Sequence, residues 1–372
     1  MRSSQAIINL SNLKKNFSNI RKKVYPAKVM AVVKADAYGH GVIEVVKALN
    51  SLGDKPEYYA VALVDEGIEL RNAGINEPIL VFDALVNNNV EDYLIYNLIP
   101  TVFTLKDLNL LRAAKDKINY KENIRVHIKI DTGMNRLGIN YNEAFDFIKY
   151  LSSQTAFIID GIYTHFATSD VYNNSFAKLQ LKLFKELIEQ LRKSNISTGL
   201  VHAANSGAII NMPDSYFDMV RPGISLYGYY PSQQTNQSIK LHPVMSIISQ
   251  VASVKRIEKG ETVSYSRKFK ASKPTNIASV SFGYADGYSR RMTNKSFAII
   301  KDKIYEQVGV VTMDRIMFDV GNDKIKVGDE VILLGKSKKH EISGWDWCNI
   351  LKTIPYEITC NISKRVPRIY ID

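Results

Sequence analysis

The 372-residue sequence predicts an α/β fold made of an N-terminal (β/α)8 barrel of the TIM type, residues 1–237, and a C-terminal, mainly antiparallel β domain, residues 238–372. Up to about residue 230, short apolar runs rich in β-branched residues alternate with amphipathic segments of helical period. That alternation is typical of a parallel sheet whose strands are joined by helices. Beyond residue 230 the long helical patterns disappear.

Eight candidate strands occupy the first part of the chain, at residues 28–33, 58–62, 79–82, 99–103, 125–130, 157–163, 199–202 and 217–220. The segments between them, such as GVIEVVKALN, VDEGIELRNAG and KLQLKLFKELIEQLRKS, carry apolar residues three and four positions apart, as helices with one buried face do. Eight such units within one stretch favour a closed barrel over an open doubly wound sheet.

The second part begins after a polar, turn-prone stretch, PSQQTNQSIK, which is typical of a linker. It then contains the apolar runs VMSIISQVASVKRI, TNIASVSFG, FAIIKDKIYEQVGVV, RIMFDV and DEVILLG, separated by turn signals such as EKGE and GNDKIKVGDE. This pattern predicts antiparallel strands.

The composition argues against several classes of protein. The net charge of +12 comes from lysines and arginines scattered over helix-like segments, without the aromatic and basic motif of a nucleic-acid module, so we expect a solvated basic surface and no nucleic-acid partner. The two cysteines, Cys348 and Cys360, have no CxxC spacing and no neighbouring histidine ligands, which predicts neither a disulfide framework nor a metal site and favours a reducing compartment. With no signal peptide and no run of eighteen apolar residues, we expect a cytoplasmic protein that does not enter a membrane.

The reacting groups of such a barrel lie at the carboxyl ends of its strands. Lys34 follows the first apolar strand in VMAVVKADAYGHG, where partial burial lowers the pKa of an amine and makes it a usable Schiff-base nucleophile. Taken alone, a lysine after a strand is more often a surface residue.

Other strand ends carry polar groups that suit one bound anion and one aromatic ring: Arg136, His165, Asn205, Ser206 and Arg221. HAANSG and VRPGISLYG place small residues and free backbone N–H groups at expected helix starts, as phosphate sites do. Because no G-x-G-x-x-G or P-loop accompanies them, a phosphorylated cofactor fits better than a dinucleotide or ATP.

Nine segments in order, AVVKADAYGHG, DTGMNRLG, THFAT, HAANSG, VRPGISLYG, VSYSRKF, GYADG, VTMDR and PYEITC, closely resemble the signature segments of the alanine racemase family, from about residue 5 to residue 370. The resemblance implies a pyridoxal 5'-phosphate (PLP) enzyme that interconverts L-alanine and D-alanine and supplies D-alanine for peptidoglycan. Lys34 matches the lysine that forms the internal aldimine and acts as one base, and Tyr265 matches the base on the opposite face. Two bases are what racemisation requires, since one removes the Cα proton and the other returns it.

The resemblance also implies roles for further residues. His165 and Arg221 match a hydrogen-bonded chain that favours the phenolate of Tyr265, and Arg221 matches the partner of the pyridine nitrogen. Arg136 matches a residue that contacts the cofactor and the substrate carboxylate, and Met313 matches a second carboxylate donor. The remaining matches are the cofactor-binding Tyr38, Asn205, Ser206, Gly223, Ile224 and Tyr356, the catalytic Asp314 and the substrate-binding Tyr284. Lys129 matches a position that is carbamylated in some members of the family, and a plain lysine partnered by acidic neighbours stays open there.

The family implies a homodimer in which Tyr265 and Met313 reach the cofactor of the other subunit. A serine or broad-specificity racemase of the same mechanism stays open, although the ring of Tyr356 favours a small side chain. An amino-acid decarboxylase is disfavoured because Arg221-Pro222-Gly223 stands where that group has E-P-G-R. A non-catalytic PLP-binding protein would lack the second domain that carries Tyr265.

Overall fold

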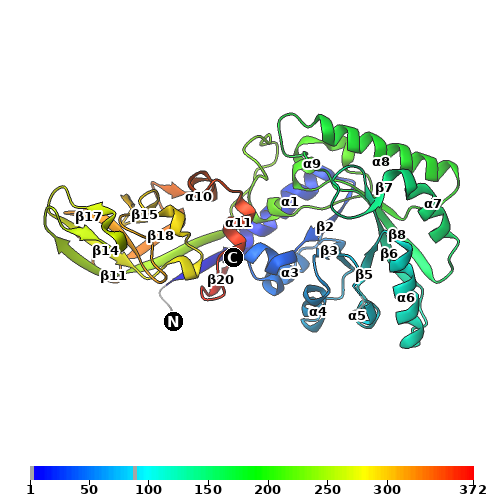
Figure 1. The fold of residues 1–372 in the computed structure, drawn as a ribbon, viewed down its shortest axis with the longest axis horizontal. Helices are drawn as coiled ribbons and strands as arrows, with labels where there is room; N and C mark the ends of the chain where they lie inside the picture. Colours follow the sequence, from blue (N-terminus) through cyan, green and yellow to red (C-terminus); the bar gives the residue numbers. More distant parts are fainter. Residues whose placement is uncertain (1–3, 87–89) are drawn as a thin grey trace. The chain divides into compact units, whose positions relative to one another are not determined.

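The structure is a computed structural model that describes residues 4–86 and 90–372 (Figure 1). The chain forms two compact units. One contains Leu13–Ala37 and Val42–His242, and the other contains residues 4–12, Tyr38–Gly41 and Pro243–Asp372.

The first unit is a closed barrel of eight parallel strands, which confirms the predicted fold class. The strands are β2 (Lys28–Val32), β3 (Tyr58–Val61), β4 (Ile79–Val81), β5 (Ile99–Val102), β6 (Ile124–Asp131), β8 (Phe157–Tyr163), β9 (Leu200–His202) and β10 (Met219–Val220). Neighbours in space run β5, β4, β3, β2, β10, β9, β8, β6, and the β5–β6 pairing, with Thr101 opposite His127, closes the ring. The short β7 (Ile139–Asn140) pairs with the end of β6. All eight predicted strands are present.

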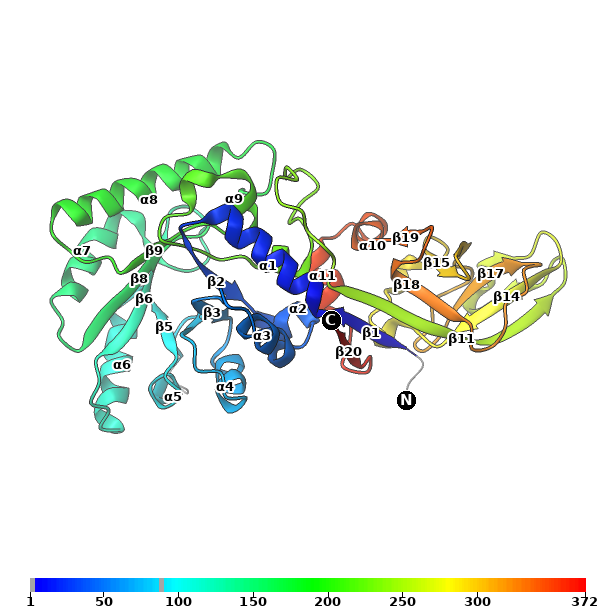
Figure 2. The ribbon, with the colours of Figure 1, turned by 180° about the vertical axis from the view of Figure 1, so that it is seen from behind.

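The helices lie outside this ring of strands (Figures 1 and 2). They are α1 (Leu10–Val24), α3 (Val42–Asn50), α4 (Val64–Asn72), α5 (Val90–Ile95), α6 (Leu105–Lys117), α7 (Tyr141–Ser152), α8 (Ser175–Lys193) and α9 (Ser206–Asn211), with the short 3-10 turns η1 (Pro213–Ser215) and η2 (Ile224–Tyr227). In α8, Leu181, Phe184, Ile188 and Leu191 are buried at spacings of three and four residues, so the helix covers the sheet with one apolar face.

Helix α6 shows how the sequence fixes a helix start. Thr104 accepts the backbone N–H of Asp107 at 3.2 Å, and the Asp107 carboxylate accepts the backbone N–H of Thr104 at 2.9 Å. This reciprocal pair satisfies two N–H groups that the helix itself cannot.

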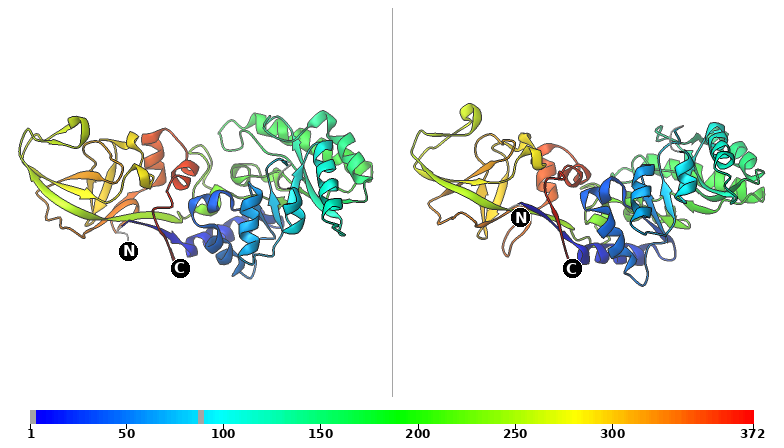
Figure 3. Two further views of the ribbon diagram at one scale, coloured as in Figure 1. Left: turned by 60° about the horizontal axis from the view of Figure 1, so that its bottom comes forward. Right: turned by 90° about the horizontal axis from the view of Figure 1, so that it is seen from below.

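The second unit is built on antiparallel strands, as predicted. They are β11 (Met245–Ile257), β12 (Thr262–Val263), β13 (Phe269–Lys270), β14 (Thr275–Val280), β15 (Phe297–Ile300), β16 (Lys303–Glu306), β17 (Ile316–Gly321), β18 (Glu330–Lys336), β19 (Glu341–Ile342) and β20 (Arg368–Ile371), with α10 (Gly344–Leu351), α11 (Pro355–Cys360) and the 3-10 turns η3 (Tyr265–Arg267), η4 (Tyr284–Asp286) and η5 (Arg290–Met292). The long β11, yellow-green in Figure 3, pairs with β1, β14 and β18.

The N-terminal strand β1 (Gln5–Asn9) belongs to this second unit and not to the barrel. It pairs antiparallel with β11 and parallel with β20, so that Ala6 lies opposite both Ile247 and Arg368. Ala6 and Ile8 are fully buried there. The second unit therefore needs both ends of the chain.

Three further features bear on function. In the described residues, no helix combines the length and apolarity needed to cross a bilayer. Over the same residues, no three or more His, Cys, Asp or Glu side chains are grouped as metal ligands. Cys348 is buried and Cys360 is exposed, and neither belongs to a disulfide in the part of the chain that the structure describes.

Candidate active site

Lys34 begins a left-handed turn two residues after the end of the barrel strand β2. The turn is α2 (Lys34–Gly39), and the φ angles of its residues Ala35 to Tyr38 lie between 52° and 56°. Each non-glycine residue in this conformation costs about 1–2 kcal/mol, and such strain clusters at functional sites. The carboxylate of Glu66 supports the turn by accepting the backbone N–H of Ala35 at 2.6 Å, and Asp36 accepts that of Val42 at 2.7 Å. The partly buried Lys34 thus leaves the strand on a fixed backbone.

The end of the same segment, Tyr38–Gly41, packs within the second unit against the C-terminal residues of the chain. The rings of Tyr38 and Tyr356 have centroids 5.9 Å apart. A Cβ on Gly39 would lie 2.3 Å from the carbonyl oxygen of Thr359, and a Cβ on Gly41 would lie 1.8 Å from Oη of Tyr370. Both glycines have positive φ, so the GHG sequence is required by conformation and by contact. Two predicted cofactor residues, Tyr38 and Tyr356, therefore lie together.

Arg221 follows β10 and is buried, with both terminal nitrogens of its guanidinium in hydrogen bonds. It donates to the carbonyl oxygens of Thr164 at 2.7 Å and Ala203 at 3.0 Å and to Nδ1 of His202 at 2.8 Å. Its carbon Cζ lies 5.1 Å from the ring centroid of Tyr163. Burial lowers the pKa of Arg221 to about 10, so the group stays a cation at neutral pH.

His165, two residues after β8, is held neutral by its surroundings. Arg221 Nη2 lies 3.4 Å from its Nδ1, and Asn205 Nδ2 lies 3.5 Å from its Nε2. Both neighbours are donors, so a protonated ring would oppose N–H to N–H. Burial first, and then the charges of Arg221 and Arg136, hold the pKa of His165 well below 6.5.

Ser206 forms hydrogen bonds between the HAANSG and VRPGISLYG segments, which the sequence predicts as a phosphate site. Its buried Oγ accepts the backbone N–H of Gly223 at 2.9 Å and lies 3.0 Å from Oγ of Ser225. Next to it, Asn205 caps α9 by accepting the N–H of Ala208 at 3.0 Å. The start of α9 and the segment with Gly223 and Ile224 are thereby brought side by side.

Lys129, on β6, lies in an excess of positive charge. Burial first, and then the charges of Arg136 and Arg221, lower the pKa of Lys129 to about 8, with a further contribution from Lys34. The nearby carboxylate of Asp131 opposes this shift. Asp131 also accepts the N–H groups of Gly133 and Asn135, which shapes the turn before the exposed Arg136. Mutual repulsion among the four cations Lys34, Lys129, Arg136 and Arg221 favours the binding of an anionic ligand.

In the second unit, Tyr265 lies in a strained and open segment. Ser264 and Ser266, on either side of it, have φ angles of 66° and 56°, and Ser264 Oγ donates to the carbonyl oxygen of Val310 at 2.7 Å. Tyr265 is 71% exposed. An open pocket of about 410 Å³ lies here, lined by Val263, Ser264, Tyr265, Ser279, Thr312, Arg315 and Met317.

Met313 and Asp314 form the tip of a tight turn next to Tyr284. Thr312 Oγ1 donates to the carbonyl oxygen of Arg315 and accepts its N–H, both at 3.0 Å. The backbone N–H of Tyr284 donates to the carbonyl oxygen of Thr312 at 3.0 Å. Arg365 donates to the Asp314 carboxylate at 2.7 Å, while the side chains of Met313 and Tyr284 are about half exposed.

The predicted site residues thus form two groups. Lys34, Lys129, Arg136, His165, Asn205, Ser206, Arg221, Gly223 and Ile224 lie at or after the carboxyl ends of barrel strands, and Tyr38, Tyr265, Tyr284, Met313, Asp314 and Tyr356 lie in the second unit. Sequence reasoning missed His202 and His127, which connect to Arg221 inside the barrel. The signal that could have found them was a histidine at an apolar-flanked position of each strand, between Val126 and Ile128 in β6 and after Val201 in β9.

Comparison with known proteins identifies the family of the chain. The family model for the alanine racemase N-terminal domain matches residues 8–231, and that for the C-terminal domain matches residues 244–370. A curated alanine racemase from Carboxydothermus hydrogenoformans is 41% identical over 374 residues, which covers 100% of both chains.

Solved structures give the same result. Alanine racemase from Clostridium difficile 630 is 37% identical with a TM-score of 0.93, over 99% of this chain and 96% of that one. Alanine racemase from Bartonella henselae, solved with covalently bound pyridoxal phosphate, is 29% identical with a TM-score of 0.89, over 100% of both chains. The resemblance seen in the sequence is confirmed, and the chain belongs to the alanine racemase family.

Proposed function

We propose that this chain interconverts L-alanine and D-alanine with PLP attached to Lys34, and that Lys34 and Tyr265 are the two bases. The observation that carries this proposal is the gathering of Lys34, Arg136 and Arg221 around His165 and Lys129 at the carboxyl ends of the barrel strands. An amine on a rigid turn beside buried cations suits a cofactor and a substrate that are both anionic.

The side chains on the barrel fit PLP. Ser206, Gly223 and Ile224 lie on the two loops that Ser206 joins, where small residues and backbone N–H groups suit a phosphate. Arg221 would face the ring nitrogen, and Arg136 the phenolic oxygen. The covalently bound pyridoxal phosphate in the Bartonella henselae relative supports the same cofactor here.

When bound, PLP withdraws electrons from the Cα of an attached amino acid and so makes its proton acidic. Lys34 Nζ then takes or returns that proton on one face, and Tyr265 Oη does so on the other. A tyrosine with a pKa near 10 needs positive charge nearby to act as a base, which Arg221 would supply through a hydrogen bond to the neutral His165, whose ring would in turn donate to Tyr265. Arg221 itself keeps its proton, because its pKa of about 10 lies well above neutral pH.

The substrate carboxylate would be held by Arg136 and by the backbone of Met313. We assign Asp314 a supporting role in catalysis, since its bond to Arg365 fixes the turn that carries Met313. Tyr284, packed on the same turn, would border the substrate, and Tyr356 would limit the side chain to a size near methyl.

We further propose a homodimer in which Tyr265, Tyr284 and Met313 complete the site of the other subunit. The exposure of these three side chains in the single chain supports a dimer, because a phenol that serves as a base must lie against a cofactor and not in solvent. Cytoplasmic location and supply of D-alanine for peptidoglycan are part of the same proposal.

The test is to incubate the purified protein with PLP and L-alanine in heavy water and to follow D-alanine and Cα deuteration together. The wild type should form deuterated D-alanine. In Tyr265→Phe, exchange should persist from one enantiomer only, while the cofactor still binds. The absence of D-alanine with wild-type protein would contradict the proposal, and loss of PLP binding in Tyr265→Phe would show that this residue has another role.

A further inference from the structure

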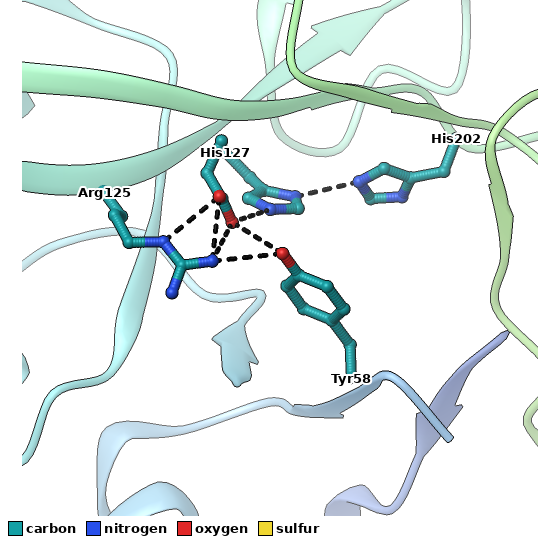
Figure 4. Close-up of polar contacts among 5 residues, drawn as sticks. Tyr58, Arg125, His127 and His202 are labelled. Atoms are coloured by element: carbon teal, nitrogen blue, oxygen red, sulfur yellow. Dashed lines mark hydrogen bonds and ion pairs between the residues drawn. The ribbon is translucent and has the colours of Figure 1, made fainter. Parts of the chain in front are cut away.

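A column of polar side chains runs through the interior of the barrel. Tyr58, Arg125, His127 and His202 come from β3, β6 and β9 and point toward one another in Figure 4. Tyr58 and Arg125 stand at the amino ends of their strands, whereas His202 ends β9 next to Arg221. Barrel interiors are normally filled with layers of apolar side chains, so a polar column needs a reason.

The column is a continuous chain of hydrogen bonds from Arg221 to Asp160. Arg221 Nη1 lies 2.8 Å from His202 Nδ1, His202 Nε2 lies 2.9 Å from His127 Nδ1, and His127 Nε2 lies 3.1 Å from Asp160 Oδ2. Both imidazoles are fully buried. Asp160 also accepts from Arg125 at 2.8 Å and from Tyr58 at 3.1 Å.

The chemistry of the two ends fixes every proton between them. A guanidinium can only donate and an ionised carboxylate can only accept. His202 must therefore accept on Nδ1 and donate from Nε2, and His127 must do the same. A proton added to either ring would set one N–H against another.

The charges agree with this assignment. Burial holds the pKa of His202 well below 6.5 and also lowers that of His127, against the pull of Asp160. Burial opposes ionisation of Asp160, but hydrogen bonds from His127 and Arg125 lower its pKa to about 2.

Packing leaves the rings little freedom to adopt another arrangement. The ring of Tyr163 stacks on His202 with centroids 4.9 Å apart and an interplanar angle of 8°. A Cβ on Gly161 would lie 2.6 Å from Cε1 of His127, so only glycine leaves room for that ring.

We propose that Asp160 is a positioning residue for Arg221 and acts through the fixed tautomers of His127 and His202. By making Nδ1 of His202 an acceptor, the carboxylate holds the guanidinium in one orientation from the far end of the barrel. The consequence for the cofactor rests on the proposed function, in which Arg221 faces the ring nitrogen. The tautomers assigned to His127 and His202 do not depend on the proposed function.

The direct test is nitrogen NMR of the resting holoenzyme labelled with ¹⁵N-histidine, with His127 and His202 assigned by single substitutions to asparagine. Both histidines should be neutral and protonated on Nε2. In Asp160→Ala the Nε2–H of His127 loses its acceptor, so the Nε2 signal of His127 should shift away from its wild-type position. In the control Tyr58→Phe, which keeps the carboxylate and its bond to His127, that signal should stay in place. An Nδ1–H tautomer or a charged ring in the wild type would overturn the inference, whatever the activity.

Kinetics and cofactor absorbance separate positioning from plain stability. Asp160→Ala should lower kcat by about 10- to 100-fold, the range found when a metal-ligating histidine loses its outer hydrogen-bond partner, with a small change in KM and an altered spectrum of bound PLP. Tyr58→Phe should stay within about twofold of the wild type. Gly161→Ala keeps every hydrogen-bonding group but displaces the His127 ring, and should reproduce the loss of kcat if Asp160→Ala does not fold.

Unchanged kcat and an unchanged PLP spectrum in Asp160→Ala or in Gly161→Ala would make this column a structural ion-pair network and overturn the positioning role. If the wild type had the expected tautomers but made no D-alanine, the proposed function would fail while the tautomer assignment stood.

Discussion

The hydroxyl of Ser206 accepts the backbone N–H of Gly223 at 2.9 Å, and this bond joins the segments that follow the neighbouring strands β9 and β10. Removing it in Ser206→Ala should raise the Kd for PLP by about tenfold, since a net hydrogen bond of this kind contributes roughly 0.5–1.5 kcal/mol. The measurement is an absorbance titration of the apoprotein. Ser215→Ala is a matched control, because Ser215 is also buried and bonds only a nearby carbonyl, that of Met212. Equal PLP affinity in both variants would remove Ser206 from the cofactor site.

Lys129 should form a carbamate. Its pKa of about 8 leaves a substantial neutral fraction near neutral pH, and only the neutral amine reacts with CO2. The product carries negative charge into a cluster of cations. We expect a carbamate signal in ¹³C NMR after incubation with ¹³C-bicarbonate, growing as the pH rises from 6 to about 9. The same signal in Lys129→Gln would assign it to another amine, and its absence in the wild type would refute carbamylation.

Stability should fall as the pH drops below about 6.5. Burial depresses the pKa values of His127, His165 and His202 in the folded protein, so below 6.5 the unfolded chain takes up protons that the folded chain does not. The free energy of unfolding is therefore highest above that pH. Below it, the free energy of unfolding declines by up to ~1.4 kcal/mol per pH unit for each histidine. Urea unfolding between pH 7.5 and 5 measures the slope, which should be shallower in His202→Asn. A flat profile would contradict the neutral assignment.

Gly41→Ala should destabilise the protein by more than backbone strain alone. Its Cβ would lie 1.8 Å from Oη of Tyr370 at a φ of +90°. Gly74→Ala is the control, because Gly74 has φ +82° with open space around it, and should cost only about 1–2 kcal/mol. In urea unfolding, Tyr370→Phe added to Gly41→Ala should restore part of the difference. Equal losses in the two glycine variants would mean that the Tyr370 contact is unimportant.

Much of the fold could be predicted because each barrel strand is a short β-branched run followed by a helical pattern, which are local signals. The pairing of β1 with β11 could not be predicted, since it joins Gln5 to the distant Ile248 and Gln5–Asn9 resembles the start of a barrel unit. The boundary between the two domains, placed after residue 237 from the sequence, stays a prediction.

The candidate site was predictable where residues follow strands, as Arg221 does. The left-handed turn after Lys34 was not, because Ala35 and Ala37 favour right-handed helix and only the surrounding contacts reverse them. The link from Asp160 to His202 was also missed, since the spacing of residues in a strand does not say which neighbours they meet across a barrel.

The most direct test of the two-base proposal is complementation between inactive variants. Dimers of Lys34→Ala are mixed with dimers of Tyr265→Phe, and the subunits are exchanged by mild unfolding and refolding with PLP. If each site takes Lys34 from one subunit and Tyr265 from the other, half of the dimers have one intact site, and D-alanine formation should return to about a quarter of the wild-type rate. If mixing restores no activity although mixed dimers form, these two residues do not act together across the subunits, and the account is wrong.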